Sequence, residues 1–152
     1  MPHTTSISEF RQRVSELFSE AVWHGRIVEV ARGSRDRAVL LGITQLERLL
    51  DPIEFHPEVI ADDEAVSIWL AELELWGRGT DFGEAKADLV AEVRDYVEEY
   101  LSESERYLAA PNRAGHFPAV VRAYAADRSG RLDEVLFAVP REVPVPREPV
   151  PA

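Results

Sequence analysis

The sequence of 152 residues contains no cysteine, which excludes disulfide bonds and metal sites built from thiolates. It also contains no apolar run long enough to span a membrane. Its first residues lack the basic segment followed by an apolar segment that marks a secretory signal. We therefore expect a cytoplasmic protein with no membrane partner. Hydrophobic residues make up 45% of the chain, which is enough for a core and argues against general disorder.

Basic residues are scarce, because 17 Lys and Arg accompany 28 Asp and Glu and the net charge is -11. Averaged over the chain, such a charge argues against binding to nucleic acid. The acidity is confined to the middle of the chain, however. Residues 49–110 hold seventeen acids and four bases, whereas the segments before and after them each have a balance of +1. The N-terminal part could therefore contact phosphate, while the acidic block faces a basic partner protein or points away from the nucleic acid.

The first fifty residues have the pattern helix, hairpin, helix. A capping box at residues 6–9 opens a helix with one apolar face, which ends at Gly25. Residues 26–31 and 38–41 are rich in β-branched and other apolar residues and predict two strands around a polar turn. A second capping box begins a short helix over residues 44–50. So short a unit cannot bury its own apolar faces well, so we expect it to dimerise.

The remaining residues have the pattern of a small sheet with helices. Residues 54–60 and 66–75 predict two strands, and Asp81 caps a long helix with an apolar stripe and an acidic face. Residues 131–139 fit either a strand or a helix. The tail over residues 140–152 contains repeated prolines and is expected to be extended or disordered.

We therefore predict an α+β fold in three parts. The head covers residues 1–51, the acidic body covers residues 52–139, and a proline-rich flexible tail covers residues 140–152. Trp69 and Trp76 lie on or beside one predicted strand, and we expect them to pack in a core or an interface.

No combination of residues indicates catalysis. The four His lack the spacing of metal ligands, and no Ser, His and Asp occur in an order typical of a nucleophilic triad. Residues 81–83 spell the Asp-Phe-Gly metal motif of kinases, but the glycine-rich loop and catalytic loop of a kinase are absent. We therefore expect no enzyme activity, no catalytic residues, no metal, no cofactor and no small-molecule substrate.

An ordered run of motifs extends over residues 4–50. It begins with Ser8-Glu9-Phe10-Arg11-Gln12, continues with the strand Arg26-Ile27-Val28-Glu29-Val30-Ala31, and then reaches Arg37-Ala38-Val39-Leu40-Leu41 and the leucines at 46, 49 and 50. This order and spacing resembles the Phd/YefM family of antitoxins from type II toxin–antitoxin systems. The resemblance covers about a third of the chain. Members of that family usually end in a short segment that folds on the toxin, whereas this chain continues with about ninety residues that have an ordered pattern.

The resemblance implies a symmetric homodimer whose paired N-terminal segments bind operator DNA. Arg11 matches the family's DNA-contacting arginine, while Arg13, Thr5 and Ser8 lie close enough in sequence to contact phosphate. Without the resemblance, both arginines would be interpreted as solvated helix residues. The residues that we expect in the dimer interface are apolar: Phe10, Val14, Leu17, Val28, Val30 and Val39.

The body carries a second, smaller resemblance over residues 54–105. An acidic turn between two strands, followed by Gly77-Arg78-Gly79-Thr80 and then Glu84-Ala85 at the start of a helix, is similar to HicB-like antitoxin domains. An acidic helix face usually serves solubility, but it can also complement a basic toxin. The residues that we expect to bind a toxin are Asp88, Glu92, Asp95, Glu99 and Tyr100.

Together these patterns predict an antitoxin. It would neutralise a cognate toxin, an RNase of the RelE/YoeB or HicA type, by direct binding, and it would repress its own operon through operator DNA. The alternative is a dimeric protein-interaction module or toxin-binding protein without DNA binding, in which the acidity of the chain forbids contact with DNA. A small hydrolase or nuclease is a third interpretation, and the sequence offers no catalytic residues for it.

Overall fold

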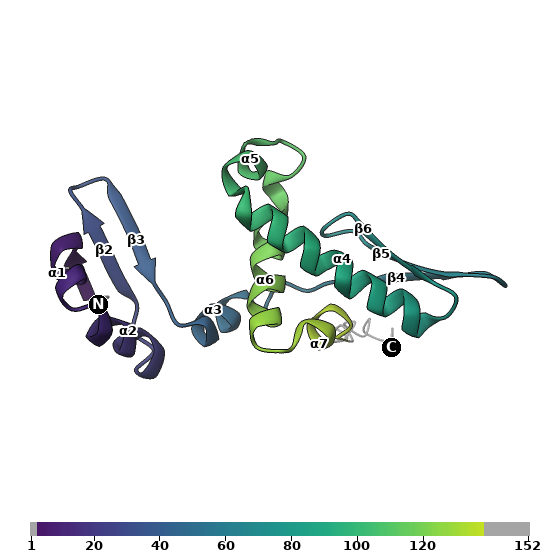
Figure 1. Cartoon of the computed structure of the whole chain (residues 1–152), viewed down its shortest axis with the longest axis horizontal. Helices are drawn as coiled ribbons and strands as arrows, with labels where there is room; N and C mark the ends of the chain where they lie inside the picture. The colour runs from purple at the N-terminus through teal and green to yellow at the C-terminus, as the bar shows by residue number, and fades with distance from the viewer. Residues whose placement is uncertain (1–2, 139–152) are drawn as a thin grey trace, which may run out of the picture.

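The computed structural model describes residues 3–138. The chain forms an elongated molecule in which the head lies at one end and the body at the other (Figure 1). The helix α3 (Ile43–Leu50) lies between them. The α+β class predicted from the sequence is confirmed, with a small sheet and helices in each part. The predicted proline-rich tail lies outside the described residues.

The head is a three-stranded sheet with two short helices packed against it. Strand β1 (His3–Ser6) pairs in parallel with β2 (Val28–Arg32), and β2 pairs antiparallel with β3 (Asp36–Leu40). Helices α1 (Ile7–Gln12) and α2 (Val14–Trp23) connect β1 to β2. The predicted hairpin is therefore present, but β1 is an addition to the predicted pattern, because no strand was predicted before the first helix.

The single helix predicted after the first capping box is wrong, because it breaks at Arg13. Ser6 caps α1 as predicted, with its hydroxyl accepting a hydrogen bond from the Glu9 N–H at 3.1 Å. Arg13 leaves the helical conformation, with φ of -118° and ψ of 22°, and it ends α1 and begins α2. Its side chain binds Glu9 on one side of the break and Glu16 on the other, which holds the two helices in this arrangement.

The body is built on an antiparallel sheet with the order β4 (Glu58–Ala61), β5 (Val66–Leu70), β6 (Leu75–Gly79). The long helix α4 (Phe82–Ser102) packs on one face of this sheet. The sequence predicted one continuous strand over residues 66–75, and this prediction is wrong. The chain turns instead between β5 and β6, so that one predicted strand becomes a hairpin.

The helix α4 lies so close to β6 that glycine is required in the strand. A Cβ atom on Gly77 would lie 2.4 Å from the Ala85 carbonyl oxygen and 2.5 Å from the Leu89 Cβ. A Cβ on Gly79 would lie 2.5 Å from the Glu84 Cβ. The Gly-x-Gly-Thr segment is therefore a packing joint between sheet and helix.

The predicted cap of α4 is confirmed at the same joint. Asp81 accepts a hydrogen bond from the Glu84 N–H at 2.8 Å. Glu84 in turn accepts hydrogen bonds from the Thr80 N–H at 2.8 Å and from the Thr80 hydroxyl at 2.6 Å. These bonds stabilise the carboxylate and lower the pKa of Glu84.

The remaining helices complete the core of the body. They are α5 (Ser104–Ala109), the short 3-10 helix η1 (Ala114–His116), α6 (Phe117–Arg128) and α7 (Leu132–Leu136). The segment that fitted either a strand or a helix thus forms a helix. The core lies between the sheet, α4 and α6, and its largest fully buried apolar side chains are Ile68, Leu70, Leu73, Leu89, Val93, Val120, Leu132 and Leu136.

The helix α3 begins at Ile43, with Gly42 at its N-cap and no capping side chain, so the second predicted capping box is wrong. Although α3 was grouped with the head in sequence, it packs against α6 of the body. Its first turn also approaches the head, since the Gln45 amide donates to the Gly25 carbonyl oxygen at 3.4 Å. The helix therefore joins the two parts of the molecule.

Candidate DNA-binding and toxin-binding surfaces

The N-terminal residues expected to contact DNA differ in their accessibility. Arg11 lies exposed in the last turn of α1, and Ser8 is exposed in the first turn. Within residues 3–138, Arg11 forms no ion pair. Thr5 is buried in β1 and its hydroxyl donates to the Ser6 carbonyl oxygen at 3.4 Å. This burial corrects the assignment of Thr5 as a phosphate contact.

Arg13 is already neutralised within the head. Its guanidinium lies 2.9 Å from the Glu9 carboxylate and 2.7 Å from that of Glu16, and both carboxylates raise the pKa of Arg13. The Arg13 side chain therefore stabilises the junction between α1 and α2. Of the two arginines, Arg11 has the charge that is free to meet a phosphate.

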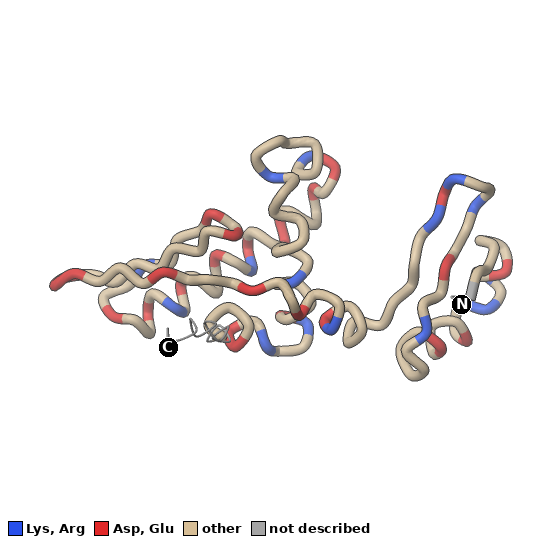
Figure 2. Tube along the Cα trace, turned by 180° about the vertical axis from the view of Figure 1, so that it is seen from behind, with Lys and Arg blue, Asp and Glu red and all other residues tan. Residues whose placement is uncertain are grey.

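A second group of arginines lies on the hairpin between β2 and β3. Arg32 pairs with Asp36 at 2.9 Å, Arg37 pairs with Glu29 at 3.3 Å, and Arg35 is exposed in the turn. Figure 2 shows this basic tip at the far end of the hairpin, away from the body. These arginines were not among the residues predicted to contact DNA, although the run Arg32-Gly33-Ser34-Arg35-Asp36-Arg37 signals them in the sequence.

The residues expected in the dimer interface fall into two groups. Leu17 and Val28 are fully buried together with Ala21, so they form the head's own core and are corrected to that role. Phe10 and Val30 are partly buried against this core. Val14 and Val39 are exposed and remain available for an interface.

The exposed apolar surface of the head is larger than the sequence analysis expected. Phe18 and Val22 lie exposed on α2, and Trp23 at its C-terminal end is 79% exposed. Ile27 follows just before β2 and is also exposed. Since α2 packs its Leu17 and Ala21 against the sheet, its outer side is a continuous apolar surface without a covering element in the described chain.

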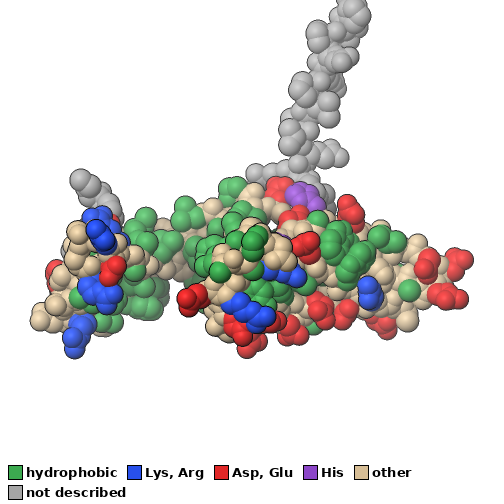
Figure 3. All heavy atoms as spheres, turned by 90° about the horizontal axis from the view of Figure 1, so that it is seen from above, with side chains coloured by type: hydrophobic (Ala, Val, Ile, Leu, Met, Phe, Trp, Pro, Cys, Tyr) green, Lys and Arg blue, Asp and Glu red, His purple; other side chains and the backbone are tan. Residues whose placement is uncertain are grey.

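The acidic residues predicted on α4 are at the surface. Asp88, Glu92, Asp95 and Glu99 are all exposed, and Figure 3 shows acidic side chains gathered along one side of the body. Asp88 also has a structural role, because its carboxylate accepts the Arg78 N–H of β6 at 2.8 Å. The other three carboxylates project from the side of α4 that faces away from the core.

Tyr100 has a different position from the one expected. It is fully buried, its hydroxyl donates to the Arg113 carbonyl oxygen at 2.9 Å, and its ring stacks on Tyr107 with centroids 4.7 Å apart. Burial raises the pKa of Tyr100. Tyr100 is therefore a core residue that fastens α4 to the segment before α6, and its assignment to a toxin-binding surface is corrected.

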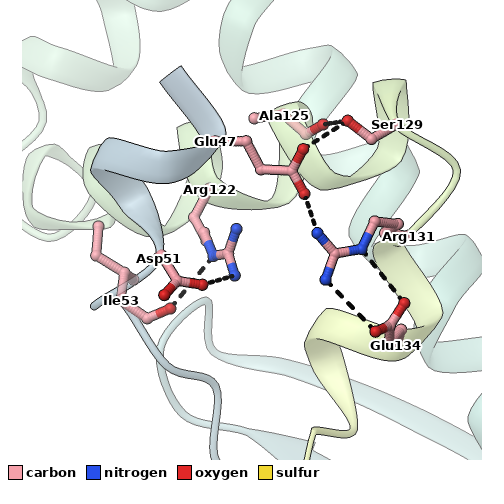
Figure 4. A network of polar contacts seen from close by, with 8 residues as sticks. All are labelled: Glu47, Asp51, Ile53, Arg122, Ala125, Ser129, Arg131 and Glu134. Carbon is pink, nitrogen blue, oxygen red and sulfur yellow. Dashed lines mark hydrogen bonds and ion pairs between the residues drawn. The ribbon is translucent and has the colours of Figure 1, made fainter. Parts of the chain in front are cut away.

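A polar network fastens α3 to the body (Figure 4). Glu47 of α3 binds the Arg131 guanidinium at 2.8 Å and accepts from the Ser129 hydroxyl at 2.7 Å. Arg122 of α6 is almost fully buried and faces Asp51 at 3.7 Å. A cavity of about 370 Å³ lies beside these groups, between the segment after α3 and the helices α6 and α7. Ion pairs and a hydrogen bond therefore contribute to the contact between α3 and the body.

The part of the chain that the structure describes offers neither a metal site nor a membrane-spanning helix. No group of His, Cys, Asp or Glu in residues 3–138 is arranged to hold a metal ion. None of the described helices is both long and apolar enough to cross a membrane.

Comparison with known protein families identifies the chain. A family model for PHD-like proteins, described as "Antitoxin of toxin-antitoxin, RelE / RelB, TA system", matches residues 1–139. The chain belongs to this antitoxin family. The antitoxin identity predicted from residues 4–50 is therefore confirmed, and the match extends over the body as well.

The fold of the antitoxin is also found in a solved structure. The crystal structure of an antitoxin part of a toxin/antitoxin system from Syntrophomonas wolfei subsp. wolfei is similar to it, with a TM-score of 0.75 and 20% sequence identity. The similarity covers 88% of this chain and 95% of the other. At this identity the likeness shows a shared fold. No curated protein matches the antitoxin.

Proposed function

We propose that this antitoxin represses its own operon by binding operator DNA through a dimer of the head. The body neutralises the cognate toxin by direct binding, and the toxin is an RNase of the RelE/YoeB or HicA type. The family description, which refers to RelE/RelB systems, supports a toxin of this class. The DNA-binding part of the proposal rests on the position and free charge of Arg11.

The small core of the head supports the dimer. Among the described residues of the head, the fully buried apolar ones are Leu17, Ala21 and Val28, which is little for an independent unit. Beside this core lie the exposed side chains of Phe18 and Trp23. Burying a large apolar side chain gains about 1.5–3 kcal/mol, so pairing two copies of α2 would supply the stability that one copy lacks.

A dimer would also place two copies of Arg11 on one face of DNA. Symmetric dimers bind palindromic operators whose half-sites follow the spacing of the two protein segments. On the hairpin, Arg32 and Arg37 are paired with Asp36 and Glu29, so Arg35 in the turn supplies the net positive charge at the outer edge of each head. Contacts of this kind to phosphate set the register, while side chains that reach base edges select the sequence.

The acidic residues of the body suit a basic toxin. Glu92, Asp95 and Glu99 are exposed on α4 and give the body a field that attracts a cationic protein. Such charges chiefly increase the rate of association. An RNase toxin binds RNA phosphate and is therefore expected to carry the complementary positive surface.

A single substitution tests the DNA-binding part. Arg11→Ala should weaken binding of the full chain to its own promoter fragment by about tenfold or more, because the contact is lost in both copies of the dimer. Arg106→Ala is the matched control, since Arg106 is likewise an exposed arginine in the last turn of a six-residue helix, but in the body. Fluorescence anisotropy with a labelled fragment measures both. If Arg11→Ala, still folded and dimeric, binds like the parent, this part of the proposal fails.

The rival function is a dimeric toxin-binding module without DNA contact. The ion pairs of Arg13, Arg32 and Arg37 favour this rival, because they neutralise positive charge within the head. A salt titration separates the two functions. Operator binding should weaken steeply as salt is raised, whereas absence of binding even at low salt supports the rival.

A further inference from the structure

The sheet of the body has one face that no described helix covers. Gly77 and Gly79 face α4, so the alternation of side chains along β6 puts Trp76 and Arg78 on the opposite face. Figure 2, seen from behind, shows the strands in front of α4 with no helix crossing them. The pairing register assigns six residues to this open sheet face: Glu58, Ile60, Ser67, Trp69, Trp76 and Arg78.

The centre of the open sheet face is aromatic and rigid. Trp69 and Trp76 are cross-strand partners, and their ring centroids lie 4.8 Å apart with an angle of 41° between the planes. The Arg78 guanidinium lies 5.7 Å from the Trp76 ring, and Trp76 itself is 39% exposed. Beside them, Ile60 of the edge strand β4 is 54% exposed. Large aromatic side chains held on paired strands lose little conformational freedom on binding, as is typical of the residues that dominate protein interfaces.

The surroundings of the open sheet face are acidic. The segment from 58 to 79 contains six acids, of which Glu58 lies on the open sheet face, while Glu72 and Glu74 pair with His56 and His116. Three of the acids, Asp62, Asp63 and Glu64, form the turn between β4 and β5. Asp62 fixes this turn by accepting the N–H groups of Glu64 and Ala65, each at 2.8 Å, and these bonds lower its pKa. The face therefore combines an apolar centre with a negatively charged rim, which is complementary to a cationic protein surface.

We propose that the toxin docks on the open sheet face, with an apolar patch against Trp69 and Trp76 and cationic side chains against the acidic rim. This inference rests on the proposed neutralisation of a toxin and names the surface that performs it. Glu92, Asp95 and Glu99 project from the exposed side of α4 and act at a distance, by attracting the basic toxin. Aromatic contact and charge then have separate effects: the tryptophans slow dissociation, and the α4 carboxylates speed association.

The test uses the full chain and the purified product of the neighbouring gene. One partner is immobilised on a biosensor surface, and the association and dissociation rates of the other are measured. Trp76→Ala should raise the dissociation constant at least about thirtyfold, mainly through faster dissociation. Ile60→Ser, a milder change at an exposed position, should raise it several-fold. Leu108→Ala is the control, because Leu108 is an exposed apolar residue of the body on α5 rather than on the open sheet face, and it should leave toxin binding unchanged.

The outcomes separate this inference from the function on which it rests. Tight binding by the parent together with unchanged binding by Trp76→Ala and Ile60→Ser overturns the docking surface and leaves the neutralising function intact. If the parent does not bind the product, the proposed neutralisation fails. If Trp76→Ala instead halves the mass of the free protein in light scattering without changing toxin binding, the face is an interface between copies of this chain and the inference is wrong.

Discussion

At the scale of single residues, the body depends on a contact that only glycine allows. The backbone of β6 passes close to α4 at Gly77, where neither neighbouring group is the free end of a flexible side chain. The carbonyl of Ala85 is engaged in the helix, and the Leu89 side chain is fully buried. The strand and helix therefore cannot move apart without opening the core.

This contact makes Gly77→Ala strongly destabilising. The added methyl group overpacks the joint, and we expect the free energy of unfolding to fall by about 2 kcal/mol or more. Gly115→Ala is the matched control, because nothing lies within 4 Å of its added Cβ, and it should change stability by less than about 1 kcal/mol. Urea denaturation followed by far-UV circular dichroism compares the two. Equal stability of both variants would show that the joint is looser than the structure indicates.

For single residues, the sequence predicted helix caps correctly but did not predict which side chains are buried. The caps formed by Ser6 and Asp81 were predictable, because a cap depends on side chains three residues apart. Burial of Leu17, Val28 and Tyr100 was not, because it depends on elements distant in the chain. An apolar residue on a helix face can serve the core of its own chain or an interface, and periodicity alone does not distinguish them.

At the scale of elements, α2 is the clearest case of a helix that is apolar on two sides. One side packs Leu17 and Ala21 against the sheet of the head, and the other exposes Phe18 and Val22. A helix at the surface ordinarily has one apolar stripe facing its own core and polar residues opposite, so a second, exposed apolar stripe favours burial against a partner. This is the physical reason for expecting a second copy of the head against it.

A charge placed on the outer side of α2 should therefore separate the proposed dimer. Phe18→Asp adds an unpaired carboxylate at the centre of the apolar surface, and we expect the mass in solution to fall from two chains to one. Leu108→Asp is the control, since Leu108 is a similarly exposed apolar residue on the helix α5 of the body. Size-exclusion chromatography with light scattering gives the masses. A parent protein that is already a single chain contradicts the proposed dimer.

The elements themselves were predictable where the pattern is local. The hairpin of the head and the helix α4 follow from β-branched runs and from a capped apolar stripe. The helix break at Arg13 was not predictable, because it depends on ion pairs with Glu9 and Glu16 and carries no proline or glycine signal. The turn after β5 was missed for a similar reason, since Glu74 adopts a positive φ of 52° although it is not glycine.

At the scale of the whole molecule, the two proposed activities lie in different parts of one chain. The helix α3 joins them, and it is held to the body by Glu47 and Asp51 through ion pairs with Arg131 and Arg122. The Glu47–Arg131 pair is partly exposed on its arginine side, and exposed ion pairs contribute only about 0–1 kcal/mol, so this pair rearranges more readily than an apolar core does. The joint is therefore where binding of a toxin to the body would change the placement of the heads on DNA, and such coupling acts equally in both directions.

The central claim is that one chain binds operator DNA with its head and a toxin with its body. Its most direct test is to titrate the same preparation of the full chain, at low salt, with its own promoter fragment and separately with the product of the neighbouring gene. We predict specific binding to both, with Arg11→Ala losing the promoter fragment and binding the toxin as the parent does. A parent chain that fails to bind its promoter fragment, or an Arg11→Ala variant that loses both partners, would contradict the claim.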